Sequence, residues 1–195
     1  MQKPNNFDKT QGFTNSEPLA PGPYICKVIG IEETTSRNGR PMVKMALDIE
    51  EGDEKGRFND IYKNDDRMDK KWPASGVMYQ LTEDVDGNCS RGFKMLIDCL
   101  EEDNLGKFGP VQWGDNFCKS IKGRLIGVVF RKEQYEAQDG ELRWSCKPNA
   151  IRHIEDIRAG KVKTPEDKYL NGNKATIQPE KPADSFQSID EDVPF

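Results

Sequence analysis

Residues 36–49 read Ser-Arg-Asn-Gly-Arg-Pro-Met-Val-Lys-Met-Ala-Leu-Asp-Ile, and this stretch decides the class of the fold. Asn38-Gly39 is the strongest short signal for a β-hairpin, because both residues tolerate the positive φ angles of a tight turn. After Pro41 the side chains alternate between apolar and mixed character, which predicts a strand with one buried face. The predicted inner face is Val43, Met45, Leu47 and Ile49, and the outer face is Met42, Lys44, Ala46 and Asp48.

The segments on either side of this stretch also indicate strands. Pro21-Gly22-Pro23 precedes an apolar run that predicts a strand from Tyr24 to Ile31. On the other side, residues 51–56 form a Gly-rich turn, and a third strand is predicted from Arg57 to Lys63. Residues 64–90 are predicted to be irregular.

The sequence from residue 91 to residue 147 predicts a helix and a second hairpin. Apolar residues at helical spacing, Phe93, Leu96, Ile97 and Leu100, predict a buried stripe on a helix from Arg91 to Asn104. A strand is predicted from Leu125 to Tyr135, and Asp139-Gly140 marks the turn to a returning strand from Leu142 to Lys147.

Three strands, a helix and a two-strand hairpin are the element order of a five-stranded OB-type barrel, in which one helix lies between the third and fourth strands. The predicted fold class is therefore mainly β, with a β-sandwich or an unrelated α+β sheet as alternatives. We expect a flexible N-terminal arm over residues 1–20, an OB-type domain over residues 21–165, and a disordered linker with an acidic tip over residues 166–195.

Composition narrows the class of protein. The 195 residues are 34% hydrophobic with a mean hydropathy of -0.84, which favours one folded domain with unfolded extensions. The sequence shows neither an apolar run long enough for a membrane span nor a secretory signal, so a cytoplasmic protein without a membrane partner is expected. Five scattered cysteines and a single histidine, His153, predict neither a metal site nor a cofactor.

The charge is divided unevenly along the chain. The formal net charge is -5, but residues 182–195 hold four acidic residues and no basic ones. The rest of the chain has 29 basic and 30 acidic residues. A nearly neutral body can still bind a polyanion if its basic side chains gather on one face.

OB folds bind single strands with aromatic side chains that stack on bases and with Lys and Arg that contact phosphates. The candidate DNA-binding residues are Arg37, Arg40, Lys44, Arg57, Phe58, Tyr62, Lys63, Lys71, Trp72, Lys122, Arg124, Arg131, Lys132, Tyr135 and Trp144. Phe58 and Tyr62 could instead form an inward core pair, and Trp144 could share the core face of Cys146. Trp72, between Lys71 and a proline in a predicted loop, is the best candidate for an exposed stacking residue.

The C-terminal tip has its own chemistry. Three acidic residues precede a rigid Val-Pro step and a terminal Phe, which together suit a basic, apolar pocket on another protein. The candidate partner-binding residues are Asp190, Glu191, Asp192, Val193, Pro194 and Phe195. The tip resembles the acidic end of bacterial single-stranded-DNA-binding proteins, which implies recruitment of replication and recombination proteins. An ordinary solvated acidic tail is the alternative.

The body of the chain resembles a family of small phage-encoded proteins with an OB-type core. The segments that carry this resemblance are Gly22-Pro23-Tyr24, residues 36–42, Gly127-Val128-Val129, residues 133–135 and residues 154–161. With the tip, the resemblance implies a phage single-stranded-DNA-binding protein that acts in replication or recombination without being an enzyme.

Two rival functions remain open. Asp53-Glu54-Lys55 has the acid-x-Lys spacing of some metal-dependent nucleases, although it falls in a predicted turn. A protein-only adaptor that acts through its acidic tail is the other alternative. Salt dependence separates nucleic-acid binding from both, because phosphate contacts weaken steeply as salt rises.

Overall fold

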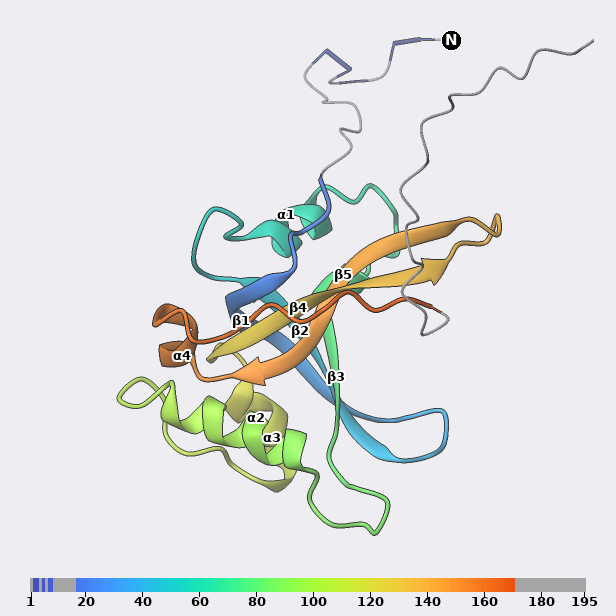
Figure 1. Ribbon diagram of the computed structural model, residues 1–195. Helices are drawn as coiled ribbons and strands as arrows, with labels where there is room; N and C mark the ends of the chain where they lie inside the picture. The colour runs from blue at the N-terminus through green and yellow to red at the C-terminus, as the bar shows by residue number, and fades with distance from the viewer. Residues whose placement is uncertain (1, 4, 6, 9–16, 171–195) are drawn as a thin grey trace, which may run out of the picture.

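The computed structural model describes residues 17–170 together with residues 2, 3, 5, 7 and 8, and it contains one antiparallel sheet with short helices at its ends (Figure 1). The strands follow the order β3-β2-β1-β4-β5. Their bounds are β1 (Gly22–Thr35), β2 (Pro41–Ile49), β3 (Val77–Leu81), β4 (Leu125–Glu136) and β5 (Leu142–Arg152). The helices are α1 (Arg57–Lys63), α2 (Arg91–Glu102), α3 (Phe117–Ile121) and α4 (Ile154–Arg158), with short 3-10 turns η1 (Ala74–Gly76) and η2 (Gly114–Asn116).

The predicted hairpin between β1 and β2 is confirmed. Gly39 has a φ of 74°, and the backbone N–H of Ser36 donates to the carbonyl of Arg40 at 2.8 Å. The alternation on β2 is also as predicted for its central residues: Val43, Met45 and Leu47 are buried, while Met42, Lys44 and Ala46 are partly exposed.

β1 is the central strand, and it has two partners. Its first residues pair with β4 and its later residues pair with β2, with a register shift between Val28 and Gly30. Such a shift bends a strand and increases its twist, so the two ends of one long strand can pair with neighbours that run in different directions. The sheet therefore curves strongly, yet β3 and β5 remain at its two edges and the sheet is not closed.

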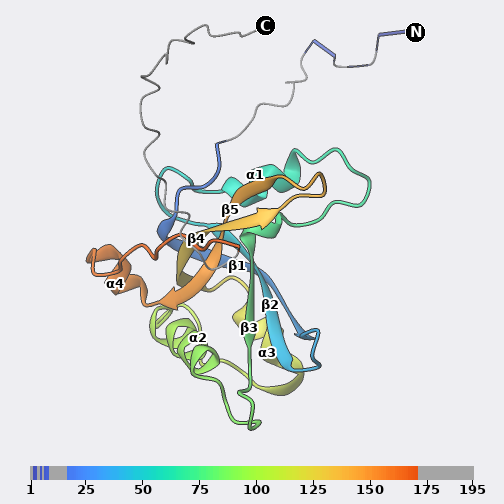
Figure 2. The same ribbon diagram turned by 45° about the vertical axis from the view of Figure 1, so that its right-hand side comes forward.

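The helices close the two ends of this curved sheet. Figures 1 and 2 show α2 and α3 together at one end and α1 at the other. The predicted helix at 91–104 is observed as α2, with its buried stripe as expected and with the hydroxyl of Ser90 accepting the N–H of Phe93 at 3.1 Å. Asn104, just beyond the helix, both donates to and accepts from the backbone of Leu125 at 2.8 Å, so it joins the end of α2 to the start of β4.

The predicted third strand is wrong, because residues 57–63 form helix α1. Gly56 adopts a left-handed φ of 78° and turns the chain out of β2. The carboxylate of Asp48 then accepts the backbone N–H groups of Phe58 at 3.0 Å and Asn59 at 3.3 Å. These bonds satisfy donors that a helix leaves free at its start, so they favour helix over strand.

The true third strand, β3, lies within the segment that was expected to be irregular. It pairs with β2, and Lys44 lies directly across from Tyr79.

The last two predicted strands are confirmed as β4 and β5, although β5 extends five residues beyond its predicted end at Lys147. Within the residues described, no helix has the length and apolar character that a membrane crossing requires.

The described chain continues past the predicted domain end at residue 165. Lys168 forms a parallel bridge with Glu133 on β4: the Gln134 N–H donates to the Lys168 carbonyl at 2.8 Å, and the Lys168 N–H donates to the Lys132 carbonyl at 2.9 Å. Leu19, placed by the sequence in the N-terminal arm, is buried in the core. The expectations for residues 9–16 and 171–195, the acidic tip included, lie outside the described residues.

Candidate nucleic-acid interface

A cleft of about 670 Å³ separates the two edge strands on the outer side of the sheet. One wall comes from β2 and β3, the other from β4 and β5, and the loop before η1 closes one end. Among the residues that the structure describes, its lining contains three lysines, two aromatic residues and a single carboxylate: Lys44, Lys71, Lys147, Trp72, Tyr79 and Glu133, with Ala74, Val77 and Pro148 as the apolar remainder.

The first wall is made by cross-strand neighbours on β2 and β3. Tyr79 lies between the inward residues Met78 and Gln80, so its ring points outward and 57% of the residue is exposed. Lys44 lies opposite, and its ammonium group is 2.7 Å from Glu32 on β1. Because exposed ion pairs of this kind contribute little stability, a phosphate can take the place of Glu32 at small cost.

The second wall is set by the alternation of β5. Cys146 is buried, so Lys147 points to the outer side, where it lies across from Arg131 on β4. Glu133 is held by Arg131 at 2.7 Å and lies 3.7 Å from Lys168. Burial alone would raise the pKa of Glu133, but the hydrogen bond from Arg131 and the charges of Lys168 and Lys147 outweigh burial and lower the pKa. Glu133, the acidic residue among the described residues that line the cleft, is therefore surrounded by positive charge.

The loop before η1 supplies Lys71 and Trp72. Lys71 is exposed and pairs with Asp69 at 3.3 Å. Trp72 differs from its prediction as an exposed stacking residue: it is half-buried, its indole N–H donates to the carbonyl of Leu47 at 3.1 Å, and its ring packs on Tyr62 with centroids 5.5 Å apart. One edge of Trp72 reaches the cleft, while the rest supports the fold.

The cleft thus unites Lys44, Lys71 and Trp72 from the sequence-predicted set, with Arg131 beside them. Tyr135 lies further along the outer face of β4, where 39% of it is exposed. Sequence reasoning missed Tyr79 and Lys147. In Val-Met-Tyr-Gln-Leu at 77–81, alternation groups Tyr79 with Val77 and Leu81 and opposite Gln80, so the sequence pattern gives no sign that Tyr79 is the exposed residue of β3.

Several predicted residues lie away from the cleft. Arg37 and Arg40 are at the β1–β2 turn, where Arg40 donates to the carbonyl of Glu83 at 2.7 Å. Lys63 and Lys122 are exposed on other parts of the surface, and Arg57 is paired with Glu54 at 2.5 Å.

Lys132 and Trp144 lie on the inward side of the β4–β5 hairpin, together with Cys146. The Lys132 ammonium group lies 4.9 Å from the centroid of the Trp144 ring, and the Tyr169 ring packs on the same ring with centroids 5.1 Å apart.

Two predicted DNA-binding residues are buried and cannot contact DNA in this structure. Phe58 on α1 is 1% exposed and stacks on Phe130 with centroids 6.0 Å apart, so the alternative assignment to the core is confirmed for it. Arg124 is 2% exposed. Its guanidinium donates to the carbonyls of Ser120 at 2.7 Å and Leu100 at 2.9 Å, and also to the carbonyl of Gly109. Arg124 therefore holds the loop after α2 in place.

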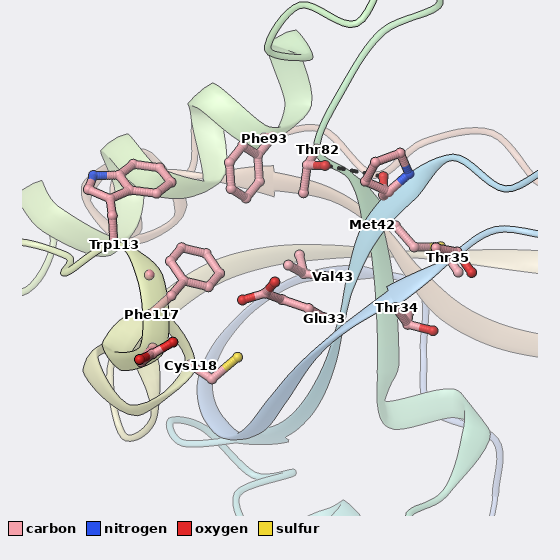
Figure 3. Close-up of a pocket in the computed structure, with 13 residues that line it drawn as sticks. Glu33, Thr34, Thr35, Met42, Val43, Thr82, Phe93, Trp113, Phe117 and Cys118 are labelled. Carbon is pink, nitrogen blue, oxygen red and sulfur yellow. Dashed lines mark hydrogen bonds between the residues drawn. The ribbon is translucent and has the colours of Figure 1, made fainter.

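A second and larger pocket, of about 730 Å³, lies between the β1–β2 hairpin and helices α2 and α3 (Figure 3). Trp113, Phe117 and Phe93 form one side, with Trp113 stacked on Phe117 at a centroid distance of 5.5 Å and 65% exposed. The charged residues in its lining are Glu33 and Asp115, both acidic. Figure 3 shows the Glu33 side chain extending toward Phe117. This pocket repels phosphate, so it does not belong to the candidate nucleic-acid interface.

The nuclease-like residues Asp53-Glu54-Lys55 lie in the turn between β2 and α1. Glu54 is paired with Arg57, and Lys55 is 3.2 Å from Glu50. Both side chains therefore have local partners at the surface.

Comparison with known proteins adds a partial family match. Residues 5–75 match the model of a family described as a protein of unknown function (DUF669). The matched region includes β1, β2 and α1 and covers less than half of the chain, so it stands as a similarity. No curated protein matches the chain.

Proposed function

We propose that this protein binds single-stranded DNA with little sequence preference through the cleft between its edge strands. The observation that supports this proposal is the grouping of Lys44, Lys71 and Lys147 around the exposed ring of Tyr79. Lysines neutralise phosphates irrespective of sequence, and an aromatic ring stacks on any base, because every base has a π-face. We infer a non-enzymatic role that keeps DNA unpaired during replication or recombination.

The position of the cleft also supports an OB-type interpretation of the sheet. An OB fold is a partly open five-stranded barrel that binds oligonucleotides across strands 2 and 3 and the two flanking loops. Here the cleft has β2 and β3 as one wall. Figures 1 and 2 show the tips of the β1–β2 and β4–β5 hairpins extending to the same side of β3, one toward each end of that strand. The edge strands β3 and β5 are not hydrogen-bonded to each other, and the cleft lies between them.

Replacing Tyr79 by Ala should weaken single-stranded DNA binding by about tenfold or more, since one stacked base contributes roughly 1–3 kcal/mol. The side chain is exposed, so the fold should be retained. Fluorescence titration with a labelled oligonucleotide measures the change. Trp113→Ala is the matched control, because it removes an exposed aromatic residue from the acidic pocket and should leave DNA affinity unchanged. Equal losses in both variants would contradict this assignment.

The acidic tip, residues 190–195, completes the proposal as a segment that recruits partner proteins through Phe195 and its acidic neighbours. By charge it also competes with DNA for the basic cleft. Deleting residues 184–195 should preserve or raise DNA affinity and abolish capture of replication and recombination proteins. Phe195→Ala keeps every side-chain charge, so it should lose partner capture with DNA affinity unchanged. A clear fall in DNA affinity after the deletion would show that this division of roles is wrong.

The protein-only adaptor is the second candidate, and one observation favours it. Trp113 is exposed at the acidic pocket, beside the rings of Phe93 and Phe117, and large exposed aromatic residues are frequent anchors of protein–protein contacts. The two candidates make opposite predictions for DNA: an adaptor of this kind would not bind oligonucleotides, and its interactions would depend on Trp113 instead of Tyr79.

A further inference from the structure

Three side chains that can bind metal meet where α2 ends and α4 begins. Cys99 and Asp103 are one helical turn apart, and His153 immediately precedes α4. The thiol sulfur, a carboxylate oxygen and a ring nitrogen all lie within 4.8 Å of one another. The sequence shows no such motif, because His153 is fifty residues from Asp103 and the two meet only through the pairing of β4 and β5.

The distances suit a small tetrahedral ion. His153 Nδ1 and Asp103 Oδ1 are 3.3 Å apart. Zinc binds nitrogen and oxygen ligands at about 2.0–2.2 Å, so a tetrahedral site separates such ligands by about 3.4 Å. The corresponding sulfur–nitrogen separation in a tetrahedral site is about 3.6 Å. Since the three ligand atoms lie within 4.8 Å of one another, the Cys99 sulfur has to move by at most about 1.2 Å to reach this separation.

The surroundings resemble the outer shell of a metal site. The second oxygen of Asp103, Oδ2, accepts the backbone N–H of Ile154 at 3.1 Å, which fixes the carboxylate. His153 Nε2 lies 3.9 Å from a carboxylate oxygen of Glu102, a position from which a modest shift would give a hydrogen bond. Histidine ligands commonly donate their second ring N–H to a carboxylate in this way.

The local charge favours a cation. Two carboxylates, those of Asp103 and Glu102, lie 3.3 Å and 3.9 Å from the ring nitrogens of His153. A divalent ion would neutralise part of this negative charge and would bind the sulfur of Cys99 in place of the thiol proton. An adjoining cleft of about 590 Å³, lined by Glu102, Asp103 and His153, gives solvent access.

We propose that Cys99, Asp103 and His153 bind one zinc ion, with a water molecule from the adjoining cleft as the fourth ligand. Mixed sulfur and nitrogen ligands in a tetrahedral arrangement select zinc over magnesium or calcium. The ion would tie the end of α2 to the start of α4, and the water ligand would leave one coordination position open to solvent. This proposal does not rest on DNA binding.

Cobalt(II) is the probe that tests the site directly, because it replaces zinc and gives visible absorption when a thiolate binds it. Titration of the full chain, purified with chelator, should produce a thiolate–cobalt absorption that saturates at one ion per chain and is displaced by zinc. Zinc should also raise the midpoint of thermal unfolding, since a ligand that binds the native state stabilises it. Absence of the absorption in the wild-type chain would overturn the proposal.

Single substitutions then locate the ion. Cys99→Ser keeps the shape of the side chain and should abolish the absorption, and His153→Ala, at a partly exposed position, should weaken zinc binding at least tenfold. Cys89→Ser is the matched control, because Cys89 is an exposed thiol outside the cluster. Loss of the signal in Cys89→Ser with retention in Cys99→Ser would assign the metal elsewhere and refute the proposed site.

Discussion

Replacing Lys44, Lys71 and Lys147 together by Gln should weaken the binding of single-stranded DNA at least about a hundredfold at low salt. These three residues supply the lysine charges that line the cleft. Each phosphate contact on a single strand contributes about -0.7 to the slope of log affinity against log salt, so the slope should become shallower by about two. The substitutions are on the surface and should change the free energy of unfolding little.

The matched control is a triple substitution elsewhere on the same protein. Lys107, Lys119 and Lys122 are exposed and lie outside the cleft, so changing them to Gln alters the net charge by the same amount. Lys122 also belongs to the set that the sequence nominated for DNA binding. Affinity and salt slope should stay close to those of the wild type. If both triple variants lose affinity equally, binding depends on overall charge and the cleft has no special role.

Replacing Arg124 by Met should destabilise the fold by about 3 kcal/mol or more. The guanidinium satisfies the carbonyls of Ser120, Leu100 and Gly109 in a buried position, and an unsatisfied buried polar group costs about 1–3 kcal/mol. Met fills a similar volume but donates no hydrogen bond. Chemical denaturation, followed by circular dichroism, measures the free energy of unfolding of both proteins.

Lys122→Met is the companion variant, two residues away and exposed, and it should change stability by less than about 0.5 kcal/mol. Folded Arg124→Met protein, assayed well below its unfolding midpoint, should bind DNA with nearly wild-type affinity. If the Arg124→Met variant is stable but no longer binds DNA, Arg124 belongs to the DNA-binding site after all.

The sequence predicted most of the sheet because the relevant signals are local. Asn38-Gly39 and Asp139-Gly140 each specify a hairpin, and alternation identifies the strands beside them. α2 was also predictable, since its apolar stripe repeats at helical spacing. The error at residues 57–63 has a tertiary cause: Asp48, on the preceding strand, caps the first turn of α1. Phe58 and Tyr62 are four residues apart, a spacing that fits one face of either a helix or a strand.

The candidate interface was predictable only in part. Lys44 could be placed on an outer face because alternation fixes the two sides of β2. Tyr79 and Lys147 could not be joined to it, because their proximity depends on how the edge strands β3 and β5 approach across the cleft. Arg124 was misassigned because a basic residue before a strand gives no sign of its own burial. The grouping of Cys99 with His153 has the same origin in tertiary contacts.

The most direct test of the central claim is a binding titration of the full chain with a single-stranded oligonucleotide and with its duplex, each at about 50 mM and about 200 mM salt. The proposed function predicts tight binding to the single strand, markedly weaker binding to the duplex, and a steep loss of affinity at the higher salt, as counterion release requires. No binding to the single strand at the lower salt would contradict it.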